Sequence, residues 1–237
     1  MPLVRRLAAV AFAALAFCAA AAAAGGDPQF QPAPVDQGWA DSIVLGPKDV
    51  GAGWRSSGLG GSMDGSGASS ATCSAPDESD LVLTGGSYSP DFLRGDGAFV
   101  SSSALVWQTP EQAQADWDRN MQPAIMGCLA AGLQESSTKK VKVIVTGRKQ
   151  LPAPGIAARS AAYRLSIVLR ATVTVRKKRR TVSARATSDF IAVGTGRATA
   201  ALWTFSFNDQ PLSDFNKQQY ALLMVRRMTV DPVPAAK

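Results

Sequence analysis

The sequence lacks residue types that most hydrolytic sites need. It contains no histidine, which excludes a Ser-His-Asp triad, a Cys-His pair and any histidine-ligated metal. Ser136 and Lys139 fit an S-x-x-K motif, but that mechanism needs the serine at a helix start, and Ser136 follows a predicted helix end. Asp116 and Asp118 lie two apart on a predicted helix and point to different sides, which argues against a carboxylate pair.

These patterns predict no catalytic residue, no metal site and no cofactor. We therefore expect a protein that is not an enzyme. An activity carried by serine, lysine or carboxylate groups that only the fold brings together is the alternative.

Cysteines offer the next candidate chemistry. The chain has three, of which Cys18 falls in the N-terminal leader, so an exported form keeps Cys73 and Cys128. An even count in an oxidising compartment predicts one disulfide between them. The alternative is two separate buried thiols.

Basic residues form the strongest charge feature. The chain carries 25 Lys and Arg against 18 Asp and Glu, a formal net charge of +7, and five of the basic residues are consecutive. The candidate residues for binding an anionic surface are Arg170, Arg176, Lys177, Lys178, Arg179, Arg180 and Arg185. For an exported protein the partner would be an anionic lipid or wall polymer. Nucleic acid is not expected, because no tryptophan lies among these charges. The alternative is a cluster that keeps the protein soluble and protects a sheet edge.

The N-terminal residues have the pattern of an export signal. Arg5 and Arg6 precede an apolar run, and an alanine tract ends at Ala24, which is typical of a secretory signal peptide over residues 1–24. An uncleaved membrane anchor is the alternative. A lipid anchor at Cys18 is disfavoured because the bulky Phe17 precedes it. We expect a secreted, extracytoplasmic protein with a flexible lead-in at 25–38, one domain at 39–230 and a tail at 231–237.

The elements that would position these residues follow from hydrophobic periodicity. Thr109 and Pro110 predict a helix start, and the apolar stripe resumes after Pro123. Strands are predicted over 98–108, 141–151, 161–175, 182–190 and 198–207, and a closing helix over 211–228. Pairing Val175 with Val182 makes residues 176–181 a hairpin tip. The predicted fold class is α+β: one domain with an antiparallel β-meander of about four to six strands and helices packed on one face.

Several short sequence motifs support a family resemblance. They are Lys48 to Trp54, the Pro-Glu-Gln-Ala helix start at Pro110, Gln122-Pro123 followed by Cys128-Leu129, and the strand Asp189 to Gly194. Their order over roughly residues 40 to 230 resembles secreted actinobacterial envelope proteins, namely the extracellular sensor domain of PknH-type Ser/Thr kinases and its free-standing relatives. The resemblance implies a compact exported α+β domain with a ligand cleft. The two cysteines of the exported form are fewer than the kinase pattern has.

Two functional hypotheses follow. The first is an exported, non-enzymatic, sensor-like domain that binds a small or envelope-derived ligand in a cleft between sheet and helices. The second is an adhesion or scaffold module that docks on anionic envelope surfaces through the basic β-hairpin.

Overall fold

The computed structural model describes residues 27–56, 60–62, 76–175, 178–207, 212–230 and 232. The helices are α2 (Pro34–Ile43), α3 (Pro47–Val50), α4 (Pro110–Asn120), α5 (Ile125–Glu135) and α6 (Asp214–Met228). The strands are β1 (Gln29–Phe30), β2 (Trp54–Ser56), β3 (Gly61–Ser62), β4 (Val82–Tyr88), β5 (Phe92–Arg94), β6 (Phe99–Trp107), β7 (Val141–Leu151), β8 (Arg159–Val175), β9 (Lys178–Thr195) and β10 (Ala198–Phe207).

Within the described residues these strands form one ten-stranded sheet. Its main path runs β1-β4-β6-β10-β9-β8-β7, and β2, β3 and β5 pair at its side. All pairings are antiparallel except that of β1 with β4. The α+β single-domain prediction is confirmed. The sheet has more strands than predicted, because two- and three-residue strands are too short to show an alternating pattern.

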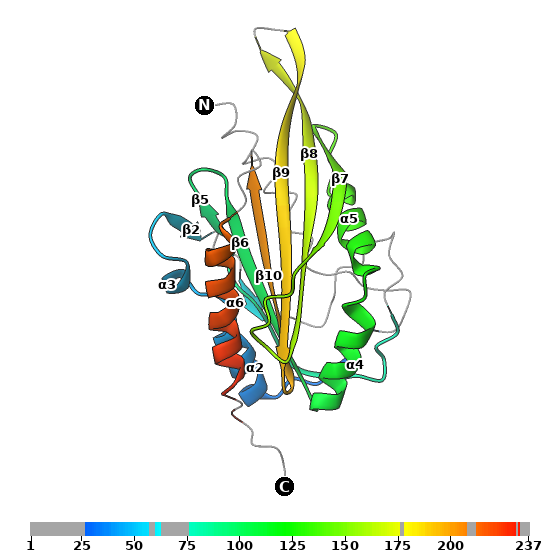
Figure 1. Cartoon of the computed structure of the whole chain (residues 1–237), viewed down its shortest axis with the longest axis vertical. Helices are drawn as coiled ribbons and strands as arrows, with labels where there is room; N and C mark the ends of the chain where they lie inside the picture. The colour runs from blue at the N-terminus through cyan, green and yellow to red at the C-terminus, as the bar shows by residue number, and fades with distance from the viewer. Residues whose placement is uncertain are drawn as a thin grey trace.

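Helices cover both faces of the sheet, whereas the sequence placed them on one (Figure 1). On β10, Ala200 and Leu202 pack with α2 and α6, and Phe205 and Phe207 pack with α5 on the other side. Successive side chains of a strand point to opposite faces, so a strand that is apolar on both needs cover on both. We call these the α6 face and the α5 face of the sheet.

The N-terminal part of the domain is more ordered than the sequence indicates. Residues 25–38 were expected to be a flexible lead-in, but Phe30 pairs with Leu83 and α2 begins at Pro34. Asp36 is buried and forms an ion pair with Arg197 at 3.0 Å. That partner is distant in the sequence, so no local pattern revealed it. The expectations for residues 1–24 and for most of the tail lie outside the described residues.

The long hairpin of β8 and β9 rises beyond the other elements (Figure 1). The predicted register is wrong by four residues along β9, because Val175 pairs with Lys178 and Ala171 with Val182. A shift by an even number keeps every side chain on its own face, so alternation alone cannot select the register. As a result Arg179 and Arg180 lie in the strand ladder, while Arg176 and Lys177 lie outside the described residues.

Candidate functional site: a groove between helix α5 and strands β7 and β8

A groove opens where the start of α5 faces β7 and β8. It has a volume of about 410 Å³ and is lined by Pro123, Ala124, Met126, Gly127, Arg148, Gln150 and Tyr163. Concave sites of a few hundred Å³ that combine apolar walls with a few polar groups are typical of small-molecule binding. We call this the α5–β7 groove; it lies between the sheet and a helix, which is where the sequence hypothesis places a ligand cleft.

A β-bulge in β7 directs the polar side chains into the groove. Val145 pairs with Ile167, but after the irregularity Arg148 pairs with Leu165 and Gln150 with Tyr163. The extra residue, Thr146, therefore exchanges the two faces of the strand: odd residues point toward α5 before it and even residues after it. Without the bulge, the side chains of Arg148 and Gln150 would point to the α6 face.

Arg148 is the charged group of the groove. A Cβ atom built on Gly127 would lie 3.8 Å from its Nη1, so the guanidinium lies directly beside the first turn of α5. Arg148 is exposed, and its side chain makes no hydrogen bond or ion pair anywhere in the described part of the chain. A guanidinium presents several N–H donors in a planar fork that suits carboxylate and phosphate groups.

Tyr163 and Met126 make the apolar floor. Both are buried and belong to the core cluster on the α5 face. The Tyr163 hydroxyl donates to the carbonyl of Met121 at 3.1 Å, and burial raises the pKa of this phenol. The phenol therefore stays neutral, and its ring acts as a fixed wall for an apolar group.

The structure separates the predicted basic residues between the two faces. Arg170, Arg179 and Arg185 face the α6 side, whereas Arg180, which pairs with Val173, faces the α5 side. All four are exposed. For Lys178 only the backbone is described, where it pairs with Val175. The described side chains Arg170, Arg179, Arg180 and Arg185 thus lie along the two strands of the hairpin, because the observed register draws residues 178–180 into β9.

Sequence reasoning missed a carboxyl pair between Glu78 and α4. Asp116 and Asp118 do not pair, as predicted, but Asp116 is buried beside Glu78, and Asn120 donates to both carboxyls, at 2.8 Å to Asp116. Burial, and then the nearby Glu78, raises the pKa of Asp116 to about 7, and burial raises that of Glu78. Glu78 is far from Asp116 in the sequence, so no spacing rule could have found the pair.

The segment that carries Glu78 is fastened to α4 by a second contact. Arg119 binds Asp80 through both guanidinium Nη atoms at 2.6 and 2.8 Å, and it donates to the carbonyl of Asp77 at 2.9 Å. The described residues include no group of three or more His, Cys, Asp or Glu side chains that could hold a metal ion.

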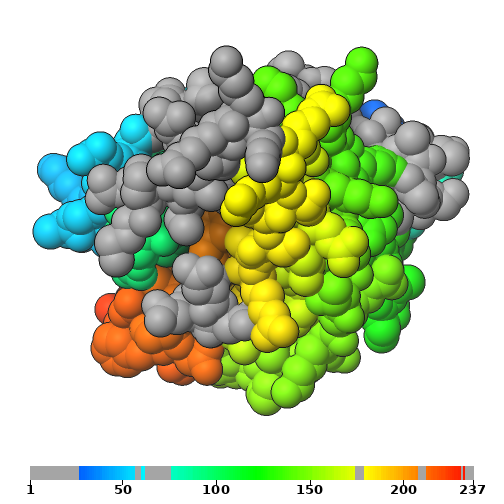
Figure 2. Space-filling model, turned by 90° about the horizontal axis from the view of Figure 1, so that it is seen from above, coloured from blue at the N-terminus to red at the C-terminus, as the bar shows by residue number. Residues whose placement is uncertain are grey.

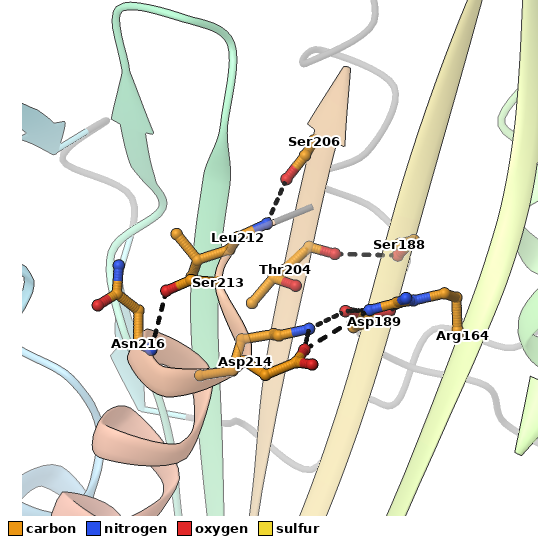
Figure 3. A network of polar contacts seen from close by, with 10 residues as sticks. Arg164, Ser188, Asp189, Thr204, Ser206, Leu212, Ser213, Asp214 and Asn216 are labelled. Atoms are coloured by element: carbon orange, nitrogen blue, oxygen red, sulfur yellow. Dashed lines mark hydrogen bonds and ion pairs between the residues drawn. The ribbon is translucent and has the colours of Figure 1, made fainter. Parts of the chain in front are cut away.

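A buried ion network lies on the α6 face (Figure 3). Asp189 is 1% exposed and accepts from Lys217 Nζ at 2.5 Å and from Arg164 at 2.6 and 2.8 Å. Asp214 binds the same lysine at 2.6 Å, which holds the pKa of that carboxyl below its usual value. The buried charges of Asp189 and Lys217 compensate each other. The network therefore joins α6 to β8 and β9, and its described members leave no open position for a ligand.

The remaining candidates from the sequence are placed as follows. Ser136 is the C-cap of α5 and its hydroxyl donates to the carbonyl of Leu133 at 2.7 Å, so it follows a helix end as predicted. Cys128 lies on α5 and is disulfide-bonded. Cys73 and Cys18 lie outside the described residues, so the pairing with Cys73 stays a prediction. No helix in the described ranges is long and apolar enough to cross a membrane.

Comparisons with known proteins find a similar arrangement of helices and strands in a solved structure, but no matching family. No protein-family model matches the chain, and no curated protein matches it. Among solved structures, it is similar to the extracellular domain of PknH from Mycobacterium tuberculosis, with a TM-score of 0.42 and 9% sequence identity over 83% of this chain and 97% of that chain. The resemblance in layout that the sequence indicates is confirmed at this level.

A second solved structure is more distant. The lipid transfer and protein localization domain of human StarD13 (DLC2) gives a TM-score of 0.18 and 11% identity over 65% of this chain and 89% of that chain. At these TM-scores neither likeness carries an argument about function, which therefore depends on the residues themselves.

Proposed function

We propose that the chain is an exported, non-enzymatic, sensor-like domain that binds a small or envelope-derived ligand in the α5–β7 groove. One observation carries the proposal: a β-bulge aims Arg148, which has no partner among the described residues, over an apolar floor of Met126 and Tyr163. A groove of about 410 Å³ is within the size range of small-molecule sites.

The chemistry of the lining selects the class of ligand. Arg148 favours a carboxylate or phosphate head, and Gln150 adds an amide that can donate or accept a hydrogen bond. Met126 and Tyr163 favour an alkyl or ring portion next to that head. The ligand class is therefore a small amphiphile with one anionic group, which the lipids and precursors of a cell envelope can supply.

Export is supported by two features of the chain. Residues 1–24 have the pattern of a signal peptide, and Cys128 is disulfide-bonded, which suits an oxidising compartment. The predicted leader lies outside the described residues. Edman sequencing of the exported protein tests this part of the proposal: a mature chain starting near Gly25 supports it, and one starting at Met1 contradicts it.

Calorimetric titration with defined probes tests the groove. Decanoate and decyl phosphate carry the two anionic heads, and decyltrimethylammonium carries the opposite charge on the same chain. We expect both anions to bind and the cation not to bind. Arg148→Gln should weaken anion binding about tenfold, because a hydrogen bond to a charged group is lost. Equal affinity for the cation would contradict the proposal.

Two matched variants locate the binding. Lys149 is the exposed neighbour of Arg148 but pairs with Arg164 and faces the α6 side, so Lys149→Gln removes the same charge and should leave affinity unchanged. Gly127→Leu should fill the groove beside Arg148 and abolish binding, while the helix gains a better helix former. If Lys149→Gln weakens binding as much as Arg148→Gln, the ligand site is not the α5–β7 groove.

A further inference from the structure

The upper part of the α6 face carries basic side chains from three adjacent strands. Lys142 of β7 pairs with Arg170 of β8, Arg185 of β9 pairs with Val168, and Arg179 of β9 pairs with Thr174. By this register Lys142, Arg170, Arg179 and Arg185 all point to the same side, and all four are exposed. We call these four residues the basic face. It is distinct from the α5–β7 groove, which opens on the opposite side of the sheet.

Acidic residues are almost absent from these strands. In the sequence of β7, β8 and β9 the only acidic residue is Asp189, which is buried and bound to Lys217 and Arg164. Asp214, at the start of α6, borders this region and binds the same lysine. The exposed charged side chains that these three strands contribute to the basic face are therefore all basic.

One pair on the basic face works against stability. Lys142 and Arg170 are direct cross-strand partners in an antiparallel ladder. Like charges at such positions repel each other because their side chains lie side by side. A threonine or glutamate at either position would relieve the repulsion, so the arrangement is better suited to an anionic partner than to the isolated domain.

An exposed aromatic side chain lies on α6, the helix that covers the same side of the sheet as the basic face. Phe215 is 68% exposed at the start of α6, next to Asp214, which approaches Arg164 within 3.8 Å. Arg185 is four residues from Asp189, the partner of Arg164, and so lies about 13 Å further along the strand. Seen from above, atoms of β9 and β8 lie in the middle of this end of the molecule (Figure 2).

We propose that the basic face docks the protein on an anionic phospholipid bilayer, with Phe215 entering the interface between headgroups and acyl chains. Each basic side chain near an anionic bilayer contributes to binding. An exposed aromatic side chain adds apolar contact with the acyl chains, which a soluble anionic polymer does not have. The four charges extend over about six residue steps of β9, or roughly 20 Å, which suits a broad planar surface better than a compact small ligand. The docking does not depend on ligand binding in the groove.

Vesicle sedimentation of the exported protein tests the proposal. The vesicles contain phosphatidylcholine alone or with 40% phosphatidylglycerol, an amount chosen to give a strong negative surface. We expect binding only to the second kind. The triple variant Arg170→Ser, Arg179→Ser, Arg185→Ser should weaken binding about a hundredfold, since each basic residue near the surface contributes about fivefold.

A charge-matched control separates the basic face from net charge. Lys48→Ser, Arg55→Ser and Arg226→Ser remove three exposed basic residues on α3, β2 and α6. This control should bind vesicles within about threefold of the wild type. Urea unfolding midpoints of both triple variants verify that they are folded. If the two triple variants bind equally weakly, net charge explains the binding and the basic face is not a docking site.

Phe215→Ser distinguishes a bilayer from a soluble anionic polymer. We expect it to weaken vesicle binding about fivefold and to leave binding to poly(glycerol phosphate) unchanged, because only the bilayer offers an apolar interior. If the protein binds the polymer as tightly as the vesicles and Phe215→Ser affects neither, the partner is a wall polymer and the bilayer proposal is wrong. Absence of binding to phosphatidylglycerol vesicles would also overturn it.

Discussion

The strand β9 passes through two regions that use charge in opposite ways. Where α6 covers the sheet, Asp189 is 1% exposed and bound to Lys217 and Arg164. Beyond the helix, Arg179 and Arg185 are exposed on the same side of the same strand. The first region buries its charges in an ion network, and the second carries exposed basic side chains.

The difference follows from the hydration that a charged side chain loses when it is buried and keeps when it is exposed. A buried ion must be compensated by a partner, because removal from water costs several kcal/mol per ion. An exposed arginine keeps its hydration and contributes little to the stability of the domain. Substitutions in the covered region should therefore change folding, while those on the basic face should change association.

The largest effect is expected from Asp189→Ala. It leaves Lys217 buried with the exposed Asp214 as its one remaining ion-pair partner among the described residues, and it removes both hydrogen bonds that Arg164 makes to Asp189. The free energy of unfolding should fall by about 4 kcal/mol, as for other broken buried pairs. Urea denaturation measures this.

Asp96→Ala is the matched control for this loss of a carboxylate. Asp96 binds Arg94 at the surface at 2.8 Å, so its removal should cost less than about 1 kcal/mol. If Asp189→Ala costs no more than Asp96→Ala, the network in Figure 3 does not hold α6 to the sheet.

A smaller, pH-dependent effect is expected at the carboxyl pair. Burial and the nearby Glu78 raise the pKa of Asp116 from its ordinary value of 3.8 to about 7, so the folded state binds a proton that the unfolded chain releases. The penalty is absent below about pH 4, grows as the pH rises toward 7, and is complete above it. Glu78, Asn120 and Arg159 are the groups that face Asp116.

Asp116→Asn removes this penalty. The variant should be about 2 kcal/mol more stable than the wild type at pH 8, and the difference should shrink as the pH falls to 4. Urea denaturation at several pH values gives the profile. A difference that does not change with pH, or one that grows as the pH falls, would contradict the raised pKa.

The smallest effect is expected on the basic face. Lys142→Glu replaces a like-charge pair with Arg170 by an opposite-charge pair and should stabilise the domain by about 0.5 kcal/mol. The same variant should bind phosphatidylglycerol vesicles more weakly than the wild type. Lys142→Gln, which only removes the repulsion, should lie between the two in both measurements. A loss of stability in Lys142→Glu would show that this pair serves the fold.

The sequence predicted elements better than their relations in space. The strands at 141–151 and 198–207 and the helix start at Thr109 are confirmed, because each rests on a local pattern. The β9 register and the ordered α2 were missed. An even register shift preserves alternation, and α2 is bound to β10's neighbouring turn by an ion pair between Asp36 and Arg197, which are far apart in the sequence.

The candidate groove depends on a single extra residue. Thr146 reverses the facing of Arg148 and Gln150, so simple alternation from Val141 assigns both side chains to the wrong face. The basic residues were identified from the sequence, but their division between two faces required the register. The Glu78 and Asp116 pair joins a loop to a helix, and only the tertiary structure reveals it.

A residue-resolved NMR titration tests most directly whether the α5–β7 groove, the covered region around Asp189 and the basic face are three separate regions with different roles. Decanoate should shift the amides of Met126, Gly127 and Gln150, whereas nanodiscs containing phosphatidylglycerol should broaden those of Lys142, Arg170 and Arg185. The amides of Asp189 and Lys217 should respond to neither. If both probes perturb the same residues, or if decanoate perturbs none of the groove, the division of the molecule into a ligand groove, a covered structural region and a basic docking face is wrong.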